Sequence, residues 1–263
     1  MSDPAQQLVL RRDAGAVAWL TLNRPQAGNS LSMELVAALS AELAELEGRE
    51  DIKVIVLAGA GGRIFCAGHD LNEFAGEEDT EFLQRDFAGL AALMQAVVEQ
   101  PQIVIAKVEG VATAAGCELV TACDLALAST VARFAVPGVN IGFWCHTPQV
   151  LLSRTVGPKQ AMMMLATGKL FPAQHALAIG LVNELHEPDA LDRAVEALVA
   201  QITAKPGSVL RHGKRSLRQQ VYLPLGEAYA FVQGEALANI LHPDAREGIE
   251  AFLEKREPNW PVR

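Results

Sequence analysis

This sequence of 263 residues has few basic residues relative to acidic ones and no long apolar run. It has 22 lysines and arginines against 31 aspartates and glutamates, which gives a formal net charge of −9. A surface with this balance repels phosphate backbones, so we expect no nucleic-acid partner. Charged or polar residues interrupt every apolar stretch before it reaches the roughly 18 to 20 residues of a spanning helix, so we expect no membrane partner.

Metal-binding motifs and paired cysteines are missing as well. The histidines and carboxylates lack the H-E-x-x-H spacing, and no two cysteines form a C-x-x-C pair, so we expect no metal site. A folded chain of this length needs no disulfide framework. We therefore expect free and mostly buried thiols at all four cysteines, Cys66, Cys117, Cys123 and Cys145.

The motifs of three other enzyme classes are absent or incomplete. Residues 59–62 begin like the dinucleotide-binding G-x-G-x-x-G, but Ile64 stands where the third glycine should be. Residues 213–216 approach a nucleotide-phosphate loop but lie in a helical region and not after a strand. The G-x-S-x-G motif of α/β hydrolases does not occur. These observations argue against nicotinamide-dependent, nucleotide-hydrolysing and serine-hydrolase functions.

The first residues do not resemble a secretory signal. Met1-Ser2-Asp3-Pro4 lack a basic region followed by an apolar stretch, and strand-like sequence begins by Leu8. We therefore expect a cytoplasmic location.

Apolar residues are abundant and regularly spaced. Half of the residues are hydrophobic and 20% are charged, which is enough apolar material for a sizeable folded core. Alternating apolar residues at 8–10 and 17–22 predict a hairpin at the start of the chain. Ser32 is a suitable cap for the amphipathic helix that follows, and Gly48 is a suitable end for it.

Strands and helices alternate through the middle of the chain. Apolar strands are predicted at 52–58, 103–108 and 124–128, and helices at 80–100 and 117–122. This alternation is typical of βαβ units with a mainly parallel sheet. The sequence therefore predicts an α/β fold.

The last third of the chain is almost entirely helical in pattern. From residue 147 onward the one exception is a short strand predicted at 181–185. We expect an α/β core at residues 1–205 and a helical C-terminal region at 206–263.

Two loops of small residues follow buried strands. One contains Cys66 to Leu71 and the other Ala112 to Glu118. Small side chains let a ligand approach the backbone closely, and free N–H groups at a helix start favour negative charge. The loops could form an oxyanion hole, or their small residues could simply allow strands and helices to pack.

The order and spacing of several motifs resemble the crotonase (enoyl-CoA hydratase/isomerase) superfamily. The motifs are Asn23-Arg24-Pro25, Phe65 to Leu71, Gly110 to Asp124, Phe134 to Pro137, Thr167-Gly168 with Ala173 to Leu181, and Ala251 to Arg256. Residues 134–148 and 247–260 are most similar to the enoyl-CoA hydratase domain-containing protein 3 branch. The resemblance covers nearly the whole chain.

This resemblance implies a crotonase-like ββα spiral with a helical C-terminal trimerisation region. It also implies a homotrimer or a dimer of trimers. The implied substrate is an acyl-CoA thioester of fatty acid metabolism, with no tightly bound cofactor, because coenzyme A enters as part of the substrate.

The resemblance also implies a set of catalytic groups. The amides of Ala67 and Ala115 would bind the thioester oxygen, and Glu118 matches one of the two catalytic glutamates of hydratases. Donors placed where negative charge develops lower the barrier to enolate formation. Gly138 stands where the second glutamate should be, so the two-glutamate mechanism cannot operate in its usual form. Asp70, Cys145, His146 or a bound water could substitute for it.

Further residues are expected to bind the substrate by the same resemblance. Those for coenzyme A are Arg24, Ala27, Gly68, His69, Asp70, Leu71, Phe252 and Lys255, and those for the acyl pocket are Gly138, Trp144 and His146. A plain structural role is open for several of them: Arg24 could cap a turn, Phe252 could fill a helix seam, and Lys255 could be solvated.

The sequence thus predicts an enoyl-CoA hydratase/isomerase that works through a stabilised enolate. The alternatives are a double-bond isomerase or another reaction that needs a single glutamate, and an acyl-CoA-binding protein without catalysis. An isomerase tolerates the loss of one glutamate because one base can move a proton between two carbons.

Overall fold

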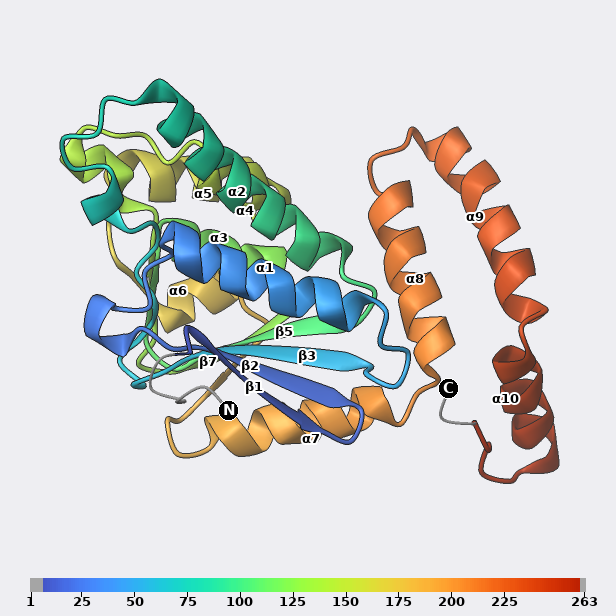
Figure 1. The fold of residues 1–263 in the computed structure, drawn as a ribbon. Coiled ribbons are helices and arrows are strands. Elements are labelled where there is room, and N and C mark those ends of the chain that lie inside the picture. Colours follow the sequence, from blue (N-terminus) through green and yellow to red (C-terminus); the bar gives the residue numbers. More distant parts are fainter. Residues whose placement is uncertain (1–6, 261–263) are drawn as a thin grey trace.

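A hairpin and a parallel sheet form the centre of the computed structural model, which describes residues 7–260. Strand β1 (Val9–Ala14) pairs antiparallel with β2 (Val17–Leu22), as the alternating pattern predicts. From β2 the sheet continues in parallel through β3 (Val54–Gly59), β5 (Ile103–Val108), β7 (Leu125–Ser129) and β10 (Glu184–His186) (Figure 1). The expected α/β class is confirmed.

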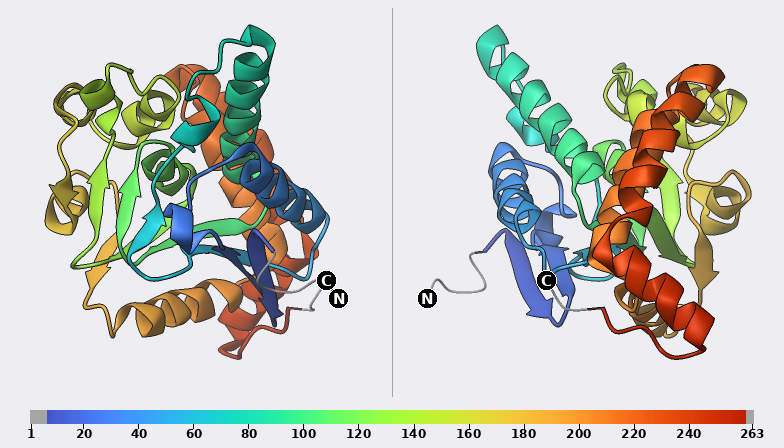
Figure 2. Two further views of the ribbon diagram at one scale, coloured as in Figure 1. Left: turned by 60° about the vertical axis from the view of Figure 1, so that its left-hand side comes forward. Right: turned by 90° about the vertical axis from the view of Figure 1, so that its right-hand side faces the viewer.

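A second, smaller sheet lies beside the first. Its strands are β4 (Ile64–Cys66), β6 (Val111–Thr113), β8 (Arg133–Ala135) and β9 (Phe171–Pro172), the first three of them parallel. The left view of Figure 2 shows the cyan β4 and the green β6 and β8 side by side. Each follows a strand of the large sheet and precedes a helix, so the expected repeat of two strands and a helix is confirmed.

Helices cover both faces of the large sheet. On one face lie α1 (Met33–Glu47), α2 (Thr80–Glu99) and α3 (Ala115–Ala122), and on the other lies α7 (Leu191–Thr203) (Figure 1). Successive side chains of a strand point to opposite faces. Ile55 and Leu57 of β3 accordingly join the core under the first three helices, whereas Val54 and Val56 pack with Leu191 of α7.

The first helix shows how local sequence places these elements. The hydroxyl of Ser32 accepts a hydrogen bond from the backbone N–H of Leu35, and the helix ends at Gly48, as predicted. Its buried residues recur at helical spacing: Leu35, Val36, Leu39, Leu43 and Leu46. Each buried leucine contributes about 1.5–3 kcal/mol relative to an exposed one.

Short helices occupy several of the connections within the core. They are η2 (Pro25–Ala27), η3 (Leu71–Glu73), η4 (Pro137–Ile141), α4 (Pro148–Thr155), α5 (Pro158–Thr167) and α6 (Ala173–Ala178). The strand expected at 181–185 is shorter and begins at Glu184, because the amides of Leu181 and Val182 bond to the carbonyl of Ala176 at the end of α6.

The C-terminal helices form an arm at one side of the core. Helix α8 (Gly207–Gln220) packs beside β5, and α9 (Leu225–Ile240) and α10 (Pro243–Glu254) pack on α8 (Figure 1). Buried Lys214 holds α8 to the core, since its Nζ lies 2.6 Å from Asp124 Oδ2 and donates to the carbonyl of Gln102. Within residues 7–260, no helix has both the length and the apolar character needed to cross a bilayer.

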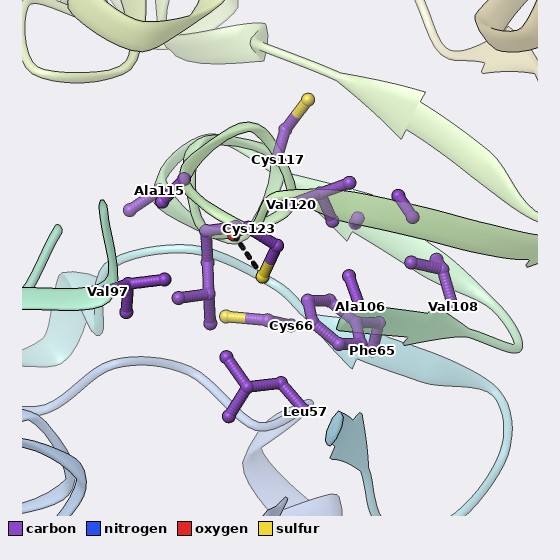
Figure 3. Close-up of a cluster of buried hydrophobic side chains, with 14 of the residues drawn as sticks. Leu57, Phe65, Cys66, Val97, Ala106, Val108, Ala115, Cys117, Val120 and Cys123 are labelled. Atoms are coloured by element: carbon purple, nitrogen blue, oxygen red, sulfur yellow. Dashed lines mark hydrogen bonds between the residues drawn. The ribbon is translucent and has the colours of Figure 1, made fainter. Parts of the chain in front are cut away.

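All four cysteines are free and buried, as expected. Figure 3 shows Cys66 and Cys123 in the core between β4 and α3, with Leu57 of β3 below them. Burial raises the pKa of the Cys66 and Cys117 thiols to about 12, so both stay protonated at neutral pH.

Candidate active site

A cavity of about 540 Å³ lies where three segments meet: the loop through η3 into α2, the start of α3, and the segment from η4 into α4. These segments lie together at the upper left of Figure 1, far from α10. The lining is predominantly apolar: Ala67, His69, Leu71, Phe74, Phe87, Leu90, Ala114, Ala115, Pro137, Gly138, Asn140, Ile141, Phe143, Cys145, His146, Thr147 and Pro148.

The backbone amides of His69 and Ala115 line this cavity, and neither has a hydrogen-bond acceptor among the described residues. Ala115 is the first residue of α3, where N–H groups lack an intrahelical acceptor. The Gly68 carbonyl and the Asp70 amide both bond to Leu31. Because successive amides in an extended segment point to opposite sides, the His69 N–H faces away from Leu31.

Ala67 is not available as the oxyanion donor expected from the sequence. Its N–H donates to the carbonyl of Gly28 at 2.9 Å, although its side chain lines the cavity. The amide of this loop that has no acceptor is instead that of His69, two residues along. The direction of an amide depends on the local backbone, and Gly68 between the two has a φ of +99°.

The two loops approach each other as closely as their small residues allow. A Cβ atom on Gly68 would lie 2.7 Å from the Cβ of Ala114 and 2.8 Å from the carbonyl oxygen of Thr113. Ala114 itself has a φ of +51°, a conformation that costs a residue with a side chain of order 1–3 kcal/mol. This strained residue precedes Ala115, so the strain is located where the chain turns an amide into the cavity.

Glu118 lies one turn into α3, behind the residues that line the cavity. It is 3% exposed, and its Oε2 has no partner among the described residues. Burial raises its pKa to about 7, and a hydrogen bond with the side chain of Thr147, which lines the cavity, opposes this rise. A carboxyl with a pKa near 7 can both accept and donate a proton at neutral pH.

Gly138 leaves no room for the second glutamate of hydratases. A Cβ atom there would lie 2.3 Å from the carbonyl oxygen of Phe143 and 2.8 Å from the Sγ of Cys145. The Gly138 amide donates to this sulfur, and the Phe143 amide donates to the Gly138 carbonyl. The close packing of this segment is therefore consistent with glycine, and not glutamate, at position 138.

Arg24 and Asp70 form an ion pair beside the loop that contains His69. Arg24 Nη2 lies 3.0 Å from Asp70 Oδ2, and Nη1 donates to the carbonyl of Ser30. Burial opposes ionisation of Asp70, but hydrogen bonds from Asn72 and Arg24 lower its pKa overall. Arg24 therefore holds the turn around Ala27, and its charge is already paired within the chain.

The imidazole of His69 contacts a buried carboxylate that the sequence analysis missed. His69 Nε2 lies 2.5 Å from Oδ2 of Asp86, on α2. Burial lowers the pKa of His69 and raises that of Asp86. A polar residue among the apolar positions of α2, four residues before Leu90, was the one available signal.

A cation site at this pair is not favoured by the geometry. Ligand atoms of His69, Glu73 and Asp86 lie within 4.8 Å of one another. Two ligands bound to one tetrahedral ion at 2.0–2.2 Å would lie about 3.3–3.6 Å apart. The 2.5 Å contact is shorter than that, and both oxygens of Glu73 accept from the Met33 amide. The cluster is better described as an ion pair of His69 and Asp86 beside a carboxylate that accepts from the Met33 amide.

The remaining expected site residues divide into two groups. His146 and Leu71 line the cavity, whereas Trp144 packs against the core and donates from Nε1 to Gln149. Phe252 is 82% exposed on α10, and Lys255 ends that helix; both lie away from this cavity within one chain (Figure 1).

Comparisons with known proteins agree with this architecture. A family model for enoyl-CoA hydratase/isomerase matches residues 12–263. The Danio rerio protein named enoyl-CoA hydratase domain-containing protein 3, mitochondrial, is 37% identical over 260 residues, which cover 99% of this chain and 90% of that protein.

Two solved structures are also similar. An enoyl-CoA hydratase from Mycobacterium smegmatis superposes with a TM-score of 0.93 at 45% identity, covering 96% of this chain and 98% of that one. The human enoyl-CoA hydratase domain-containing protein 3 has a TM-score of 0.93 at 35% identity, covering 96% of this chain and all of that one.

The expected cytoplasmic location is wrong by the same comparison. The Danio rerio and human relatives, at 37% and 35% identity, are both named mitochondrial. The expectation depended on residue types at the start of the sequence, and residues 1–6 lie outside the described part of the chain.

Proposed function

Since the chain belongs to the enoyl-CoA hydratase/isomerase family, we propose that it binds an acyl-CoA thioester with the carbonyl oxygen between the amides of His69 and Ala115. The observation that supports this proposal is the pair of unpartnered amides on two loops that line one cavity. Removing a proton next to the carbonyl places negative charge on that oxygen. Fixed N–H donors stabilise this charge without reorganising.

Glu118 is proposed as the one acid/base of the reaction. Acting on a 3-enoyl thioester, its carboxylate takes a proton from C2, the electrons move into an enolate held by the two amides, and the same carboxyl returns the proton to C4. The double bond moves from C3 to C2, and the protein ends in its starting state. A pKa near 7 suits both halves of this cycle.

Isomerisation fits the site better than hydration because Gly138 supplies no second carboxyl. Hydration is the second candidate. His146 and Thr147 place an imidazole and a hydroxyl on the cavity wall, where they could hold a water, and the similar Mycobacterium smegmatis structure is named a hydratase. A purely binding role is disfavoured, because a binding site gains nothing from a buried carboxyl with one unpartnered oxygen.

Turnover of a 3-enoyl-CoA and of crotonyl-CoA by the same preparation tests the proposal. We expect the first to gain the absorbance of a conjugated thioester and the second to be hydrated much more slowly. Faster hydration would replace isomerisation by the second candidate. Failure of both reactions, together with failure to exchange C2 protons of the substrate into D₂O, would refute catalysis through an enolate.

We further propose that the chain assembles as a homotrimer, alone or as a dimer of trimers, through the C-terminal arm. Large apolar side chains stay exposed on α9 and α10 in the single chain: Leu225, Tyr229, Leu237, Ile240, Phe252 and Leu253. Such a surface is typical of an interface. A neighbour could bring Phe252 and Lys255 to the ligand. Light scattering should give a mass of three or six chains, and a monomer would contradict the proposal.

A further inference from the structure

Three phenylalanines from three different segments form one aromatic wall of the cavity. Phe74 follows η3, Phe87 lies on α2, and Phe143 follows η4. The rings of Phe74 and Phe87 are 5.5 Å apart at 27°, and those of Phe87 and Phe143 are 6.2 Å apart at 17°. They therefore form a row of stacked rings.

This row begins at the oxyanion loop and leads away from it. The ring of His69, whose amide is a proposed oxyanion donor, lies 4.4 Å from that of Phe74 and 5.9 Å from that of Phe87. The ring of Phe143, the last of the row, lies 6.2 Å from that of Phe87. An acyl chain whose carbonyl is held at His69 would follow these rings.

The far part of the cavity leaves large apolar groups in contact with water. Phe143 is 45% exposed and Ile141 is 63% exposed, beside Leu71 at the rim. Few polar groups interrupt this surface, and the side-chain amide of Asn140 is engaged with the carbonyl of Gly168. An exposed apolar surface next to a cavity favours an apolar ligand that covers it.

We infer that the acyl group of the substrate is a chain of medium length, an inference that rests on the proposed function. Carbon–carbon bonds of 1.52 Å advance an extended chain by about 1.3 Å per carbon. The two steps from His69 to Phe87 and from Phe87 to Phe143 measure 5.9 and 6.2 Å and match about eight to ten carbons at that advance. A four-carbon acyl group would end near Phe87 and leave Phe143 uncovered.

Titration calorimetry with saturated acyl-CoA esters of four to twelve carbons tests this inference without requiring turnover. A methylene buried from water contributes about 0.8 kcal/mol, so affinity should rise about fourfold per carbon, or on the order of 10²-fold from butyryl to octanoyl. The rise should level off beyond ten carbons. Equal affinities, or tightest binding of butyryl-CoA or of a benzoyl ester, would overturn the inference.

Removing the ring of Phe143 tests whether this residue causes the dependence of affinity on chain length. Phe143→Ala should weaken decanoyl-CoA binding at least tenfold and change butyryl-CoA binding less than twofold. Met162→Ala, at a 56% exposed position on α5 outside the cavity, is the control and should alter neither. A Phe143→Ala variant that still favours long chains as wild type does would refute the assignment. If no ester of any length binds, the proposed function fails, which is a different outcome from equal binding of all lengths.

Discussion

Replacing Glu118 by glutamine is expected to lower kcat for the isomerisation roughly 10²- to 10⁴-fold, the usual contribution of a positioned general acid/base. Glutamine has nearly the same shape as glutamate but cannot accept the C2 proton. Affinity for a saturated acyl-CoA should change little, because binding depends on the two amides and the apolar wall. Steady-state kinetics and calorimetry on the same preparations separate the two effects.

The dependence of kcat/KM on pH tests whether the group removed by this substitution is the general base. Because the carboxylate of Glu118 is the proposed base and its pKa is raised to about 7, wild-type kcat/KM should increase with pH and level off above that value. The residual activity of Glu118→Gln should lack this step. A profile that keeps its midpoint in the mutant would assign the base to another group.

Stability provides a control for the same variant. The pKa of Glu118 is about 7 in the folded state against an ordinary value of 4.5, so its ionisation costs stability. The protonated Glu118 carboxyl therefore makes its full contribution to the stability of the wild type below pH 4.5. This contribution is lost as the pH rises from 4.5 through about 7. Glu118→Gln should therefore unfold no earlier than wild type at pH 8. An earlier transition would mean that the fall in kcat reflects damage to the fold.

Replacing the peptide N–H of residue 69 by an ester oxygen is expected to lower kcat roughly 10²- to 10³-fold, the effect of deleting one oxyanion-hole donor. Semisynthesis of a depsipeptide bond makes this change and leaves the His69 side chain and its contact with Asp86 in place. The loss should appear in kcat more than in KM, because the oxygen carries its full charge only in the transition state.

The same ester at residue 67 is a matched control two positions away. Its N–H faces the carbonyl of Gly28, so the ester there should cost some stability and leave kcat within a few-fold of wild type. A large loss of kcat at residue 67, with little at residue 69, would restore the donor expected from the sequence. Thermal unfolding of both esters checks that the loops remain folded.

The periodic elements could be predicted from sequence because they depend on near neighbours. Ser32 and Gly48 bound α1 as expected, and β3 and β5 are apolar runs of the right length. The small second sheet could not be predicted as strands, because β4, β6 and β8 have three residues each and show no alternation. They pair only with segments far along the chain, as Ile64 does with Val111.

The two loops of the candidate site could be predicted from the sequence, but the atoms that face the cavity could not all be predicted. Motif spacing led to Ala115 and Glu118, which lie at the start of α3 as expected. The Gly68 turn and the hydrogen bond at Ala67 determine which amide of the first loop faces the cavity. Neither feature can be inferred from the residue types. Asp86 escaped notice because its partner, His69, is brought to it only by the fold.

Donors that belong to the main chain, as proposed for residues 69 and 115, depend little on residue type. Every amino acid except proline supplies an N–H, so almost any codon at positions 69 and 115 would still encode a donor. The contact of the His69 side chain with Asp86, by contrast, depends on the residue type at position 69. The surrounding side chains could therefore change, and with them the substrate and the reaction, while the proposed oxyanion donors are kept.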